Sequence, residues 1–163
     1  MIVYHGSTEI IKNPDVVHSK KYLDFGRGFY ITSFENQAKK WAVRKGMRQE
    51  KTAIVNVYEL CEEWDDFKVL SFEKENEKWL DFVCACRKGQ LLNKEYDIVI
   101  GNVADDDVFK TVDMYFRGLW DKEKVLGELR YYKMNNQICI VNQETLNRLI
   151  TFKRAYEVEN NGR

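Results

Sequence analysis

Short apolar runs alternate with amphipathic segments along the chain, and this pattern most constrains the fold. The apolar runs are rich in β-branched and aromatic residues, which is typical of strands. The segments between them have apolar residues at helical spacing. The two kinds of segment do not follow the strict strand–helix–strand order of a parallel α/β protein. We therefore expect an α+β fold with an antiparallel or mixed sheet.

The expected elements can be placed by residue number. Strands are expected at residues 2–4, 28–32, 52–60, 67–72, 96–104, 137–141 and 152–159. Helices are expected at residues 34–46, 73–88, 105–120, 121–131 and 142–150. Residues 5–7 read as a turn after the first strand, because glycine and serine are common in turns.

Capping and charge signals mark four of the helix ends. Thr32 followed by Glu35 is a capping-box pattern, and Gly46 is expected to end the helix that follows. Asn142 is expected to cap the last helix. The aspartates at 105–107 carry charge that suits a helix N-terminus.

The length of 163 residues favours one domain over residues 1–159, with a frayed tail at 160–163. Lys plus Arg and Asp plus Glu number 26 each, so net charge does not draw the chain to nucleic acid or to an anionic membrane. No apolar run approaches the roughly 20 residues that span a bilayer. The N-terminal residues do not resemble a signal peptide. We expect a cytoplasmic protein.

The four cysteines do not form a recognisable framework. Cys84 and Cys86 lie in an expected helix, on different faces, and no second close pair of cysteines or histidines accompanies them. We expect no metal site and no disulfide, and we expect Cys61, Cys84, Cys86 and Cys139 to be reduced and mostly buried.

The stretch Tyr-His-Gly-Ser at residues 4–7 is the first candidate for chemistry. A lone histidine beside an apolar strand is more often structural than functional. Here, however, Gly6 lets the backbone approach a ligand closely, and Ser7 adds a hydroxyl. Together with the ring of His5, these groups suit a sugar and an amide.

The stretch Asp-Phe-Gly-Arg-Gly-Phe-Tyr-Ile-Thr at residues 24–32 is the second candidate. Strand alternation sends Phe29 and Ile31 to the core and Tyr30 to the opposite face. Tyr30 is either a stacking platform for a planar ligand or a cross-strand packing residue. The glycines on either side of Arg27 indicate a tightly folded loop, and Arg27 is a candidate to contact a phosphate.

Five motifs in order resemble the ADP-ribosyltransferase superfold. They are YHGS at 4–7, DFGRGFYIT at 24–32, QAKKWA at 37–42, YDIVIGNVADD at 96–106 and NNQICI at 135–140. The resemblance is to the His-Tyr-Glu branch of diphtheria toxin and the poly-ADP-ribose polymerases, and more closely to bacterial domains suspected of being toxins. It covers roughly residues 2 to 152 and implies a split mixed or antiparallel sheet with flanking helices.

The resemblance assigns roles to matching positions. It implies that His5 bonds a ribose hydroxyl of NAD, that the backbone of Gly6 holds the nicotinamide amide, and that Tyr30 stacks on the nicotinamide ring. Ser7, Arg27 and Gly28, from the same two motifs, are further candidates to bind NAD. The third motif of the family supplies a glutamate at the start of a late strand, and Gln137 stands at that position.

Gln137 is the departure from the family pattern. Glutamine accepts and donates hydrogen bonds, but it carries no charge and cannot act as a base. Chain elongation is therefore disfavoured, although related mono-transferases tolerate a residue other than glutamate here. Glu144 is the closest downstream carboxylate, but it falls in an expected helix.

The resulting expectation is an NAD-dependent mono-ADP-ribosyltransferase, a toxin paired with a small antitoxin protein. Its acceptor is a protein or nucleic acid that the sequence does not identify, and the oligomeric state is equally open. An inactive protein that binds NAD or a partner, and an NAD glycohydrolase, are the alternatives.

Overall fold

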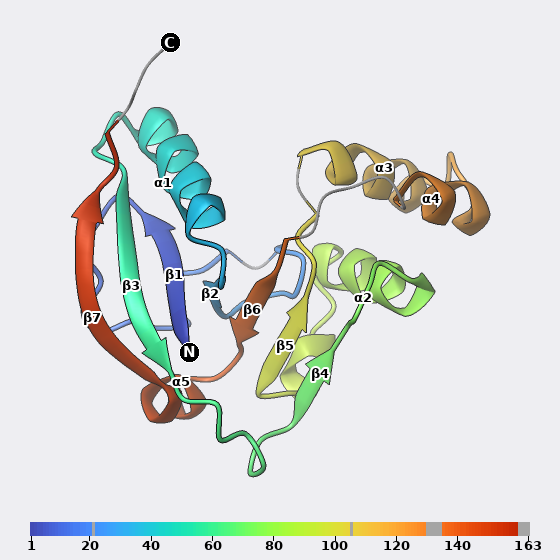
Figure 1. Cartoon of the computed structure of the whole chain (residues 1–163). Helices are drawn as coiled ribbons and strands as arrows, with labels where there is room; N and C mark the ends of the chain where they lie inside the picture. The colour runs from blue at the N-terminus through green and yellow to red at the C-terminus, as the bar shows by residue number, and fades with distance from the viewer. Residues whose placement is uncertain (21, 105, 130–134, 160–163) are drawn as a thin grey trace.

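The computed structural model describes residues 1–20, 22–104, 106–129 and 135–159 (Figure 1). Two separate sheets form its framework. The first is antiparallel, with strand order β1-β3-β7, and comprises β1 (Ile2–Ser7), β3 (Ile54–Leu60) and β7 (Ile150–Glu157). The second is mixed, with order β2-β6-β5-β4, and comprises β2 (Phe29–Ile31), β6 (Gln137–Ile140), β5 (Ile98–Gly101) and β4 (Val69–Ser71).

Helix α1 (Glu35–Gln49) packs on the first sheet (Figure 1). The helices on the side of the second sheet are α2 (Glu77–Arg87), the 3-10 helix η1 (Leu92–Glu95), α3 (Asp106–Phe116) and α4 (Lys122–Leu129). Helix α5 (Gln143–Leu149) lies at the end of the first sheet and contacts β6 and β7, one strand of each sheet. The small side chains of Ala38 and Ala42 are buried against Val55 and Val57 of β3, which lets α1 approach the sheet closely.

The two sheets meet where β1 passes the end of β2. Tyr4 and Thr32 exchange two backbone hydrogen bonds, of 2.8 and 3.0 Å, in an isolated antiparallel bridge. Beside this junction a buried cluster joins Val3 of β1 to Phe29 and Ile31 of β2. Bridge and cluster together hold the first candidate motif against the second.

The α+β class and the presence of antiparallel and mixed sheets are confirmed. Every expected strand and helix is present, with ends that differ by a few residues. Phe29 and Ile31 are buried as the alternation predicts, and the Asn142 side chain caps α5 by accepting from the backbone N–H of Thr145. The short η1 helix was not expected.

The expected turn at residues 5–7 is wrong. β1 continues to Ser7, and Gly6 and Ser7 pair with Val55 and Ile54 of β3. The glycine that suggested a turn is needed because α1 leaves no room for a side chain. A Cβ atom on Gly6 would lie 2.3 Å from the carbonyl oxygen of Ala38.

The expected start of α1 is correct to within one residue, but its capping box and its expected end are wrong. The capping box does not form: Oγ1 of Thr32 accepts from the N–H of Phe34 instead of that of Glu35, and the Glu35 side chain accepts from the hydroxyl of Tyr156. The helix passes through Gly46 and ends only at Gln49. A Cβ atom on Gly46 would lie 2.7 Å from the carbonyl oxygen of Lys51. Glycine at this position therefore lets the chain after α1 pass close to the helix.

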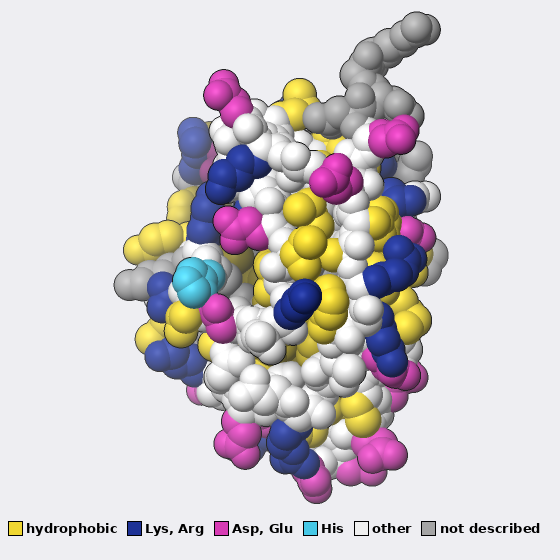
Figure 2. All heavy atoms as spheres, turned by 90° about the vertical axis from the view of Figure 1, so that its left-hand side faces the viewer, with side chains coloured by type: hydrophobic (Ala, Val, Ile, Leu, Met, Phe, Trp, Pro, Cys, Tyr) yellow, Lys and Arg dark blue, Asp and Glu magenta, His cyan; other side chains and the backbone are white. Residues whose placement is uncertain are grey.

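Three expectations fall outside the described residues: the aspartate side chains at 105–107, the end of the helix at 130–131 and the tail at 160–163. Within the described part of the chain, no helix has the length and apolar character needed to cross a bilayer. Figure 2 shows positive, negative and hydrophobic side chains intermixed on the face toward the viewer, in keeping with the balanced charge.

Candidate functional site

His5 is tied to the strand that carries Tyr30. Its Nδ1 atom lies 2.6 Å from the carbonyl oxygen of Tyr30, and its ring stacks on Phe29 with 4.6 Å between the ring centroids. Because a carbonyl oxygen only accepts, Nδ1 carries the proton, and Nε2 of the neutral ring holds the lone pair.

The surroundings of His5 keep the ring neutral. Burial lowers the pKa of His5 to about 4, the bond to the Tyr30 carbonyl opposes this, and the nearby charge of Lys45 adds to the lowering. No described residue bonds Nε2. The described residues contain no buried side-chain nitrogen or oxygen without a partner, so Nε2 is not a buried atom. The Nε2 lone pair is therefore accessible as a hydrogen-bond acceptor.

The backbone N–H and C=O groups of Gly6 point away from β3. Neighbouring strand residues point their N–H and C=O groups to opposite edges, so Gly6 points the same way as Tyr4, toward the β2 side. Among the described residues no partner bonds the backbone of Gly6 across that edge. The Ser7 side chain, in contrast, is only 2% exposed, and its Oγ accepts a long bond of 3.4 Å from the N–H of Glu9.

Tyr30 is fixed at both ends. Its hydroxyl donates to the carbonyl oxygen of Gly26 at 2.5 Å and accepts from the N–H of Phe25 at 3.1 Å. Its ring packs against the hydrophobic cluster under α2, and burial raises the pKa of its hydroxyl well above the usual value. The ring is thus rigidly placed on the face of β2 opposite Phe29.

The loop before β2 is as tight as its glycines predict. Gly26 has a φ of 73° and packs against Asn93, whose side chain also donates to the carbonyl oxygen of Arg27 at 2.9 Å. A Cβ atom on Gly28 would lie 2.4 Å from the Sγ of Cys139. Gly28 therefore serves the packing of β2 on β6, and the Arg27 side chain is exposed.

Gln137 begins β6, opposite Gly101 of β5, and is 4% exposed. The register that pairs Ile31 with Ile138 continues to Thr32 and Gln137, and Thr32 bridges to β1. Two strand spacings, about 10 Å in all, therefore separate the backbone of β1 from that of Gln137.

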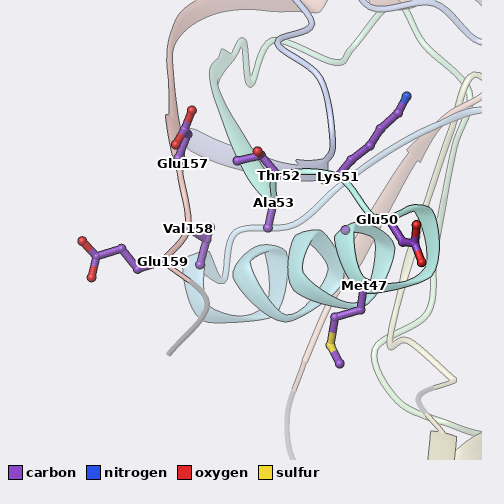
Figure 3. A pocket seen from close by; sticks show the side chains of 9 residues that line it. Met47, Glu50, Lys51, Thr52, Ala53, Glu157, Val158 and Glu159 are labelled. Atoms are coloured by element: carbon purple, nitrogen blue, oxygen red, sulfur yellow. The ribbon is translucent and has the colours of Figure 1, made fainter. Parts of the chain in front are cut away.

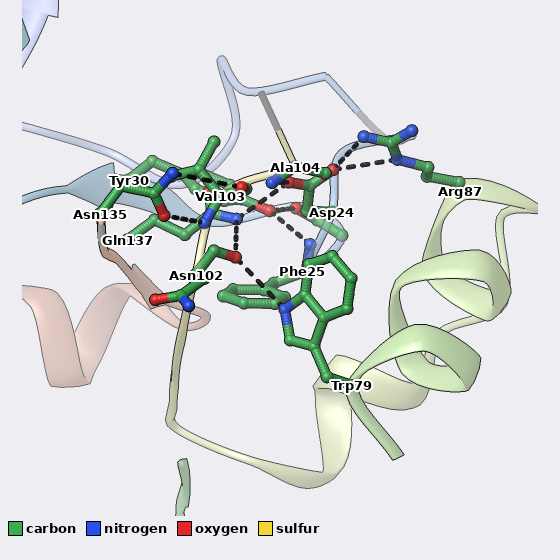
Figure 4. A network of polar contacts seen from close by, with 11 residues as sticks. Asp24, Phe25, Tyr30, Trp79, Arg87, Asn102, Val103, Ala104, Asn135 and Gln137 are labelled. Atoms are coloured by element: carbon green, nitrogen blue, oxygen red, sulfur yellow. Dashed lines mark hydrogen bonds and ion pairs between the residues drawn. The ribbon is translucent and has the colours of Figure 1, made fainter. Parts of the chain in front are cut away.

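Asp24 holds the side chain of Gln137 in a network that the sequence did not predict (Figure 4). The Nε2 atom of Gln137 donates to Oδ2 of Asp24 at 3.0 Å and, more weakly, to the carbonyl oxygen of Asn102 at 3.4 Å. Asp24 also accepts from the N–H of Ala104 at 2.9 Å and pairs with Arg87. Its partners lie 63 to 113 residues away in sequence, so no local pattern indicated them.

The carboxylate suggested from sequence lies elsewhere. Glu144 is exposed in the first turn of α5, which follows the far end of β6. Asp24 is the carboxylate that contacts Gln137.

A family model described as a protein of unknown function, DUF3990, matches residues 1–152. The chain belongs to the DUF3990 family. The match includes every candidate residue from His5 to Gln137, and Asp24 as well. A search of curated proteins found no match.

Two pockets stand out among the described residues of the DUF3990 chain, and neither is lined by His5, Gly6 or Tyr30. The larger, about 570 Å³, lies at the end of α1 (Figure 3). Glu50, Glu157 and Glu159 line it, with Lys51 as its one described cation, so it does not suit an anionic dinucleotide.

The second pocket, about 390 Å³, adjoins the Asp24 network. It is lined by Asp24 and Arg87 together with the aromatic side chains of Tyr22, Phe109 and Phe116. The guanidinium of Arg87 stacks 4.5 Å from the centre of the Phe109 ring, which helps to fix the ion pair.

The described residues of the DUF3990 chain offer neither a metal cluster nor a disulfide. These contain no group of three or more His, Cys, Asp or Glu side chains arranged to hold a metal ion. All four cysteines are free; Cys61 is exposed and the other three are buried. Burial raises the pKa of the Cys139 thiol to about 12, so this thiol is a packing group.

Proposed function

We propose that this DUF3990 protein is a cytoplasmic NAD-dependent mono-ADP-ribosyltransferase with an ADP-ribosyltransferase-like fold. The observation that carries the proposal is the bond between His5 of β1 and the backbone of Tyr30 on β2. It brings the histidine and tyrosine motifs together where the edge of Gly6 is unpaired among the described residues. Gln137 starts the strand on the other side of β2.

Each side chain has a group that suits part of NAD. The Nε2 of His5 accepts from a ribose hydroxyl, and the backbone N–H and C=O of Gly6 bond the carboxamide of nicotinamide. The Tyr30 ring offers a flat surface to the pyridine ring. The Oε1 of Gln137 accepts from the 2′-hydroxyl of the nicotinamide ribose. Arg27 is the exposed cation available to a phosphate.

The reaction is a substitution at the C1′ atom of the ribose. The bond from C1′ to the pyridinium nitrogen breaks, and its electron pair leaves on neutral nicotinamide. The sugar becomes oxocarbenium-like until a lone pair of the acceptor bonds C1′, and the acceptor loses a proton to solvent. Orientation and electrostatics supply the rate enhancement, since no protein nucleophile takes part.

One observation favours a second candidate, a protein that binds NAD without transferring ADP-ribose. Gln137 is neutral, and both oxygens of Asp24 already accept hydrogen bonds from protein groups. The described site therefore presents no free carboxylate to stabilise the positive sugar. Hydrolysis of NAD, with water as the acceptor, is the third outcome that an experiment must separate.

Incubation of the protein and a cell extract with NAD labelled in its adenylate phosphate separates the three activities. Label on protein or nucleic acid, identified as ADP-ribose by mass spectrometry, is the expected result. Free ADP-ribose alone would indicate a glycohydrolase. Unconsumed NAD that still binds in calorimetry would indicate a binding protein, and the absence of both turnover and binding would refute the proposal. The variant His5→Ala, verified as folded by circular dichroism, is the control.

A toxin role with a small neutralising partner belongs to the same proposal and rests on the resemblance alone. Induced expression in a bacterial host is expected to stop growth, and co-expression of the protein encoded beside it to restore growth. Equal arrest by the wild type and by a folded His5→Ala variant would separate any toxicity from the proposed site.

A further inference from the structure

The orientation of the Gln137 amide is imposed by its neighbours. Its Nε2 atom faces Oδ2 of Asp24 at 3.0 Å and the carbonyl oxygen of Asn102 at 3.4 Å. Both neighbours only accept hydrogen bonds, so the amide nitrogen must face them. The amide oxygen Oε1 faces the other way. No described residue donates to Oε1. Since the described residues contain no buried side-chain oxygen or nitrogen without a partner, Oε1 is not buried and is accessible.

Asp24 is itself held from two further elements. Arg87 of α2 donates to Oδ1 through Nε at 2.9 Å and through Nη2, and the N–H of Ala104 donates to Oδ2 at 2.9 Å. The side chains of Asp24 and Arg87 are only 10% and 14% exposed. A carboxylate with all these donors is not a free base; it is a fixed acceptor.

We infer that Asp24 is a positioning residue of the candidate site, which turns Oε1 of Gln137 toward the substrate and strengthens it as an acceptor. This inference rests on the proposed function. A carboxylate that accepts from an amide N–H shifts electron density toward the amide oxygen, because linked hydrogen bonds polarise one another. Gln137 thereby offers the ribose a stronger acceptor than an isolated amide.

The same geometry explains why glutamine suits this position. A glutamate there would place a second carboxylate about 3 Å from Asp24, and two carboxylates at that distance do not both ionise freely. Among the described residues, the charged groups around the position are Asp24 itself, Arg87 behind it and Glu75, which accepts from Asn102 at 2.6 Å. The hydroxyl of Tyr30 is occupied by backbone groups.

An exchange of the two side-chain types tests the inference. Asp24→Asn replaces the carboxylate by an amide whose N–H groups oppose either the donor of Arg87 or those of Ala104 and Gln137, and Gln137 loses its charged acceptor. The kcat is therefore expected to fall by about 100-fold with little change in KM for NAD. Gln137→Glu places a second carboxylate against that of Asp24, and its kcat is expected to fall by a similar factor at pH 7. The double variant Asp24→Asn/Gln137→Glu restores one donor facing one carboxylate and is expected to recover most of the wild-type kcat.

The control is Glu144→Gln, which changes an exposed carboxylate of α5 outside this network. It is expected to change kcat far less than Asp24→Asn does. Unchanged kcat in Asp24→Asn, or a double variant no better than the single variants, overturns the inference.

Failure of the proposed function is distinguishable, because the contact also has a readout without NAD. If the wild type neither binds nor consumes NAD, unfolding as a function of pH decides. Gln137→Glu is expected to gain stability relative to the double variant between pH 7 and pH 5, as one of the two opposed carboxylates takes up a proton. His5 contributes equally to both variants. Identical pH profiles would show that Asp24 does not constrain position 137.

Discussion

The Nδ1 atom of His5 lies 2.6 Å from the carbonyl oxygen of Tyr30, so a side chain of the first sheet is bonded to the backbone of the second. This bond fixes the tautomer of the ring and leaves Nε2 as the free acceptor. A protonated ring would lose that acceptor and would place a charge beside Phe29 in a partly apolar site.

The first prediction concerns the acid stability of the protein. The pKa of His5 is about 4 in the folded chain, against 6.5 for a free histidine. In this range the unfolded chain binds the proton more readily. The folded state is therefore expected to lose up to about 3 kcal/mol as the pH falls from about 6.5 to about 4, and little more from this group below that. NMR titration of the ring protons measures the pKa directly.

Two variants complete that measurement. His18→Asn assigns the two histidine spectra. His5→Asn keeps a donor for the Tyr30 carbonyl and removes the titration, so its stability curve is expected to be flatter over the same pH range. A His5 resonance that titrates near 6.5 would contradict the buried, bonded ring.

The second prediction separates the ring of Tyr30 from its hydroxyl. Tyr30→Phe removes the bonds to Gly26 and Phe25 and is expected to lower the free energy of unfolding by about 1–3 kcal/mol, because a buried N–H loses its acceptor. It keeps the flat ring, so most NAD turnover is expected to remain. Tyr30→Ala removes the ring as well and is expected to abolish turnover. Equal turnover in the wild type and in a folded Tyr30→Ala variant would remove Tyr30 from the site.

The third prediction compares two positions near the third motif. Gln137→Ala removes the acceptor Oε1 and is expected to impair NAD turnover much more than Glu144→Ala, because Glu144 is exposed beyond the opposite end of β6. Steady-state kinetics on both purified variants measure the difference. The reverse order would mean that Gln137 is not the residue of the third motif.

The strands and helices could be predicted because each depends on a local pattern. The alternation around Tyr30 correctly placed Phe29 and Ile31 in the core, and Asn142 correctly marked the start of α5. These features need only the period of a strand or the chemistry of a cap, which neighbouring residues determine.

The misread positions depend on partners that are distant in sequence. Gly6 suggested a turn, but its conformation is that of a strand that must make room for α1. Asp24 gave no signal, because its role depends on Arg87, Ala104 and Gln137, which tertiary folding brings together. A single sequence identifies the residue types of such a site but not which carboxylate meets which amide.

The fourth prediction tests whether Gly6 is required by packing. A Cβ atom at position 6 would lie 2.3 Å from the carbonyl oxygen of Ala38 and 2.7 Å from the backbone nitrogen of Ala42, and helix backbone cannot yield as a side chain can. Gly6→Ala is therefore expected to destabilise the protein by about 2 kcal/mol or more in urea denaturation. Gly127→Ala is the matched control, since nothing lies within 4 Å of a Cβ built there. In helix α4 this control is expected to gain up to about 1 kcal/mol. A Gly6→Ala variant as stable as the wild type would contradict the close packing of α1 on β1. If such a stable variant still lost NAD binding, the loss would be due to the backbone edge of position 6 alone.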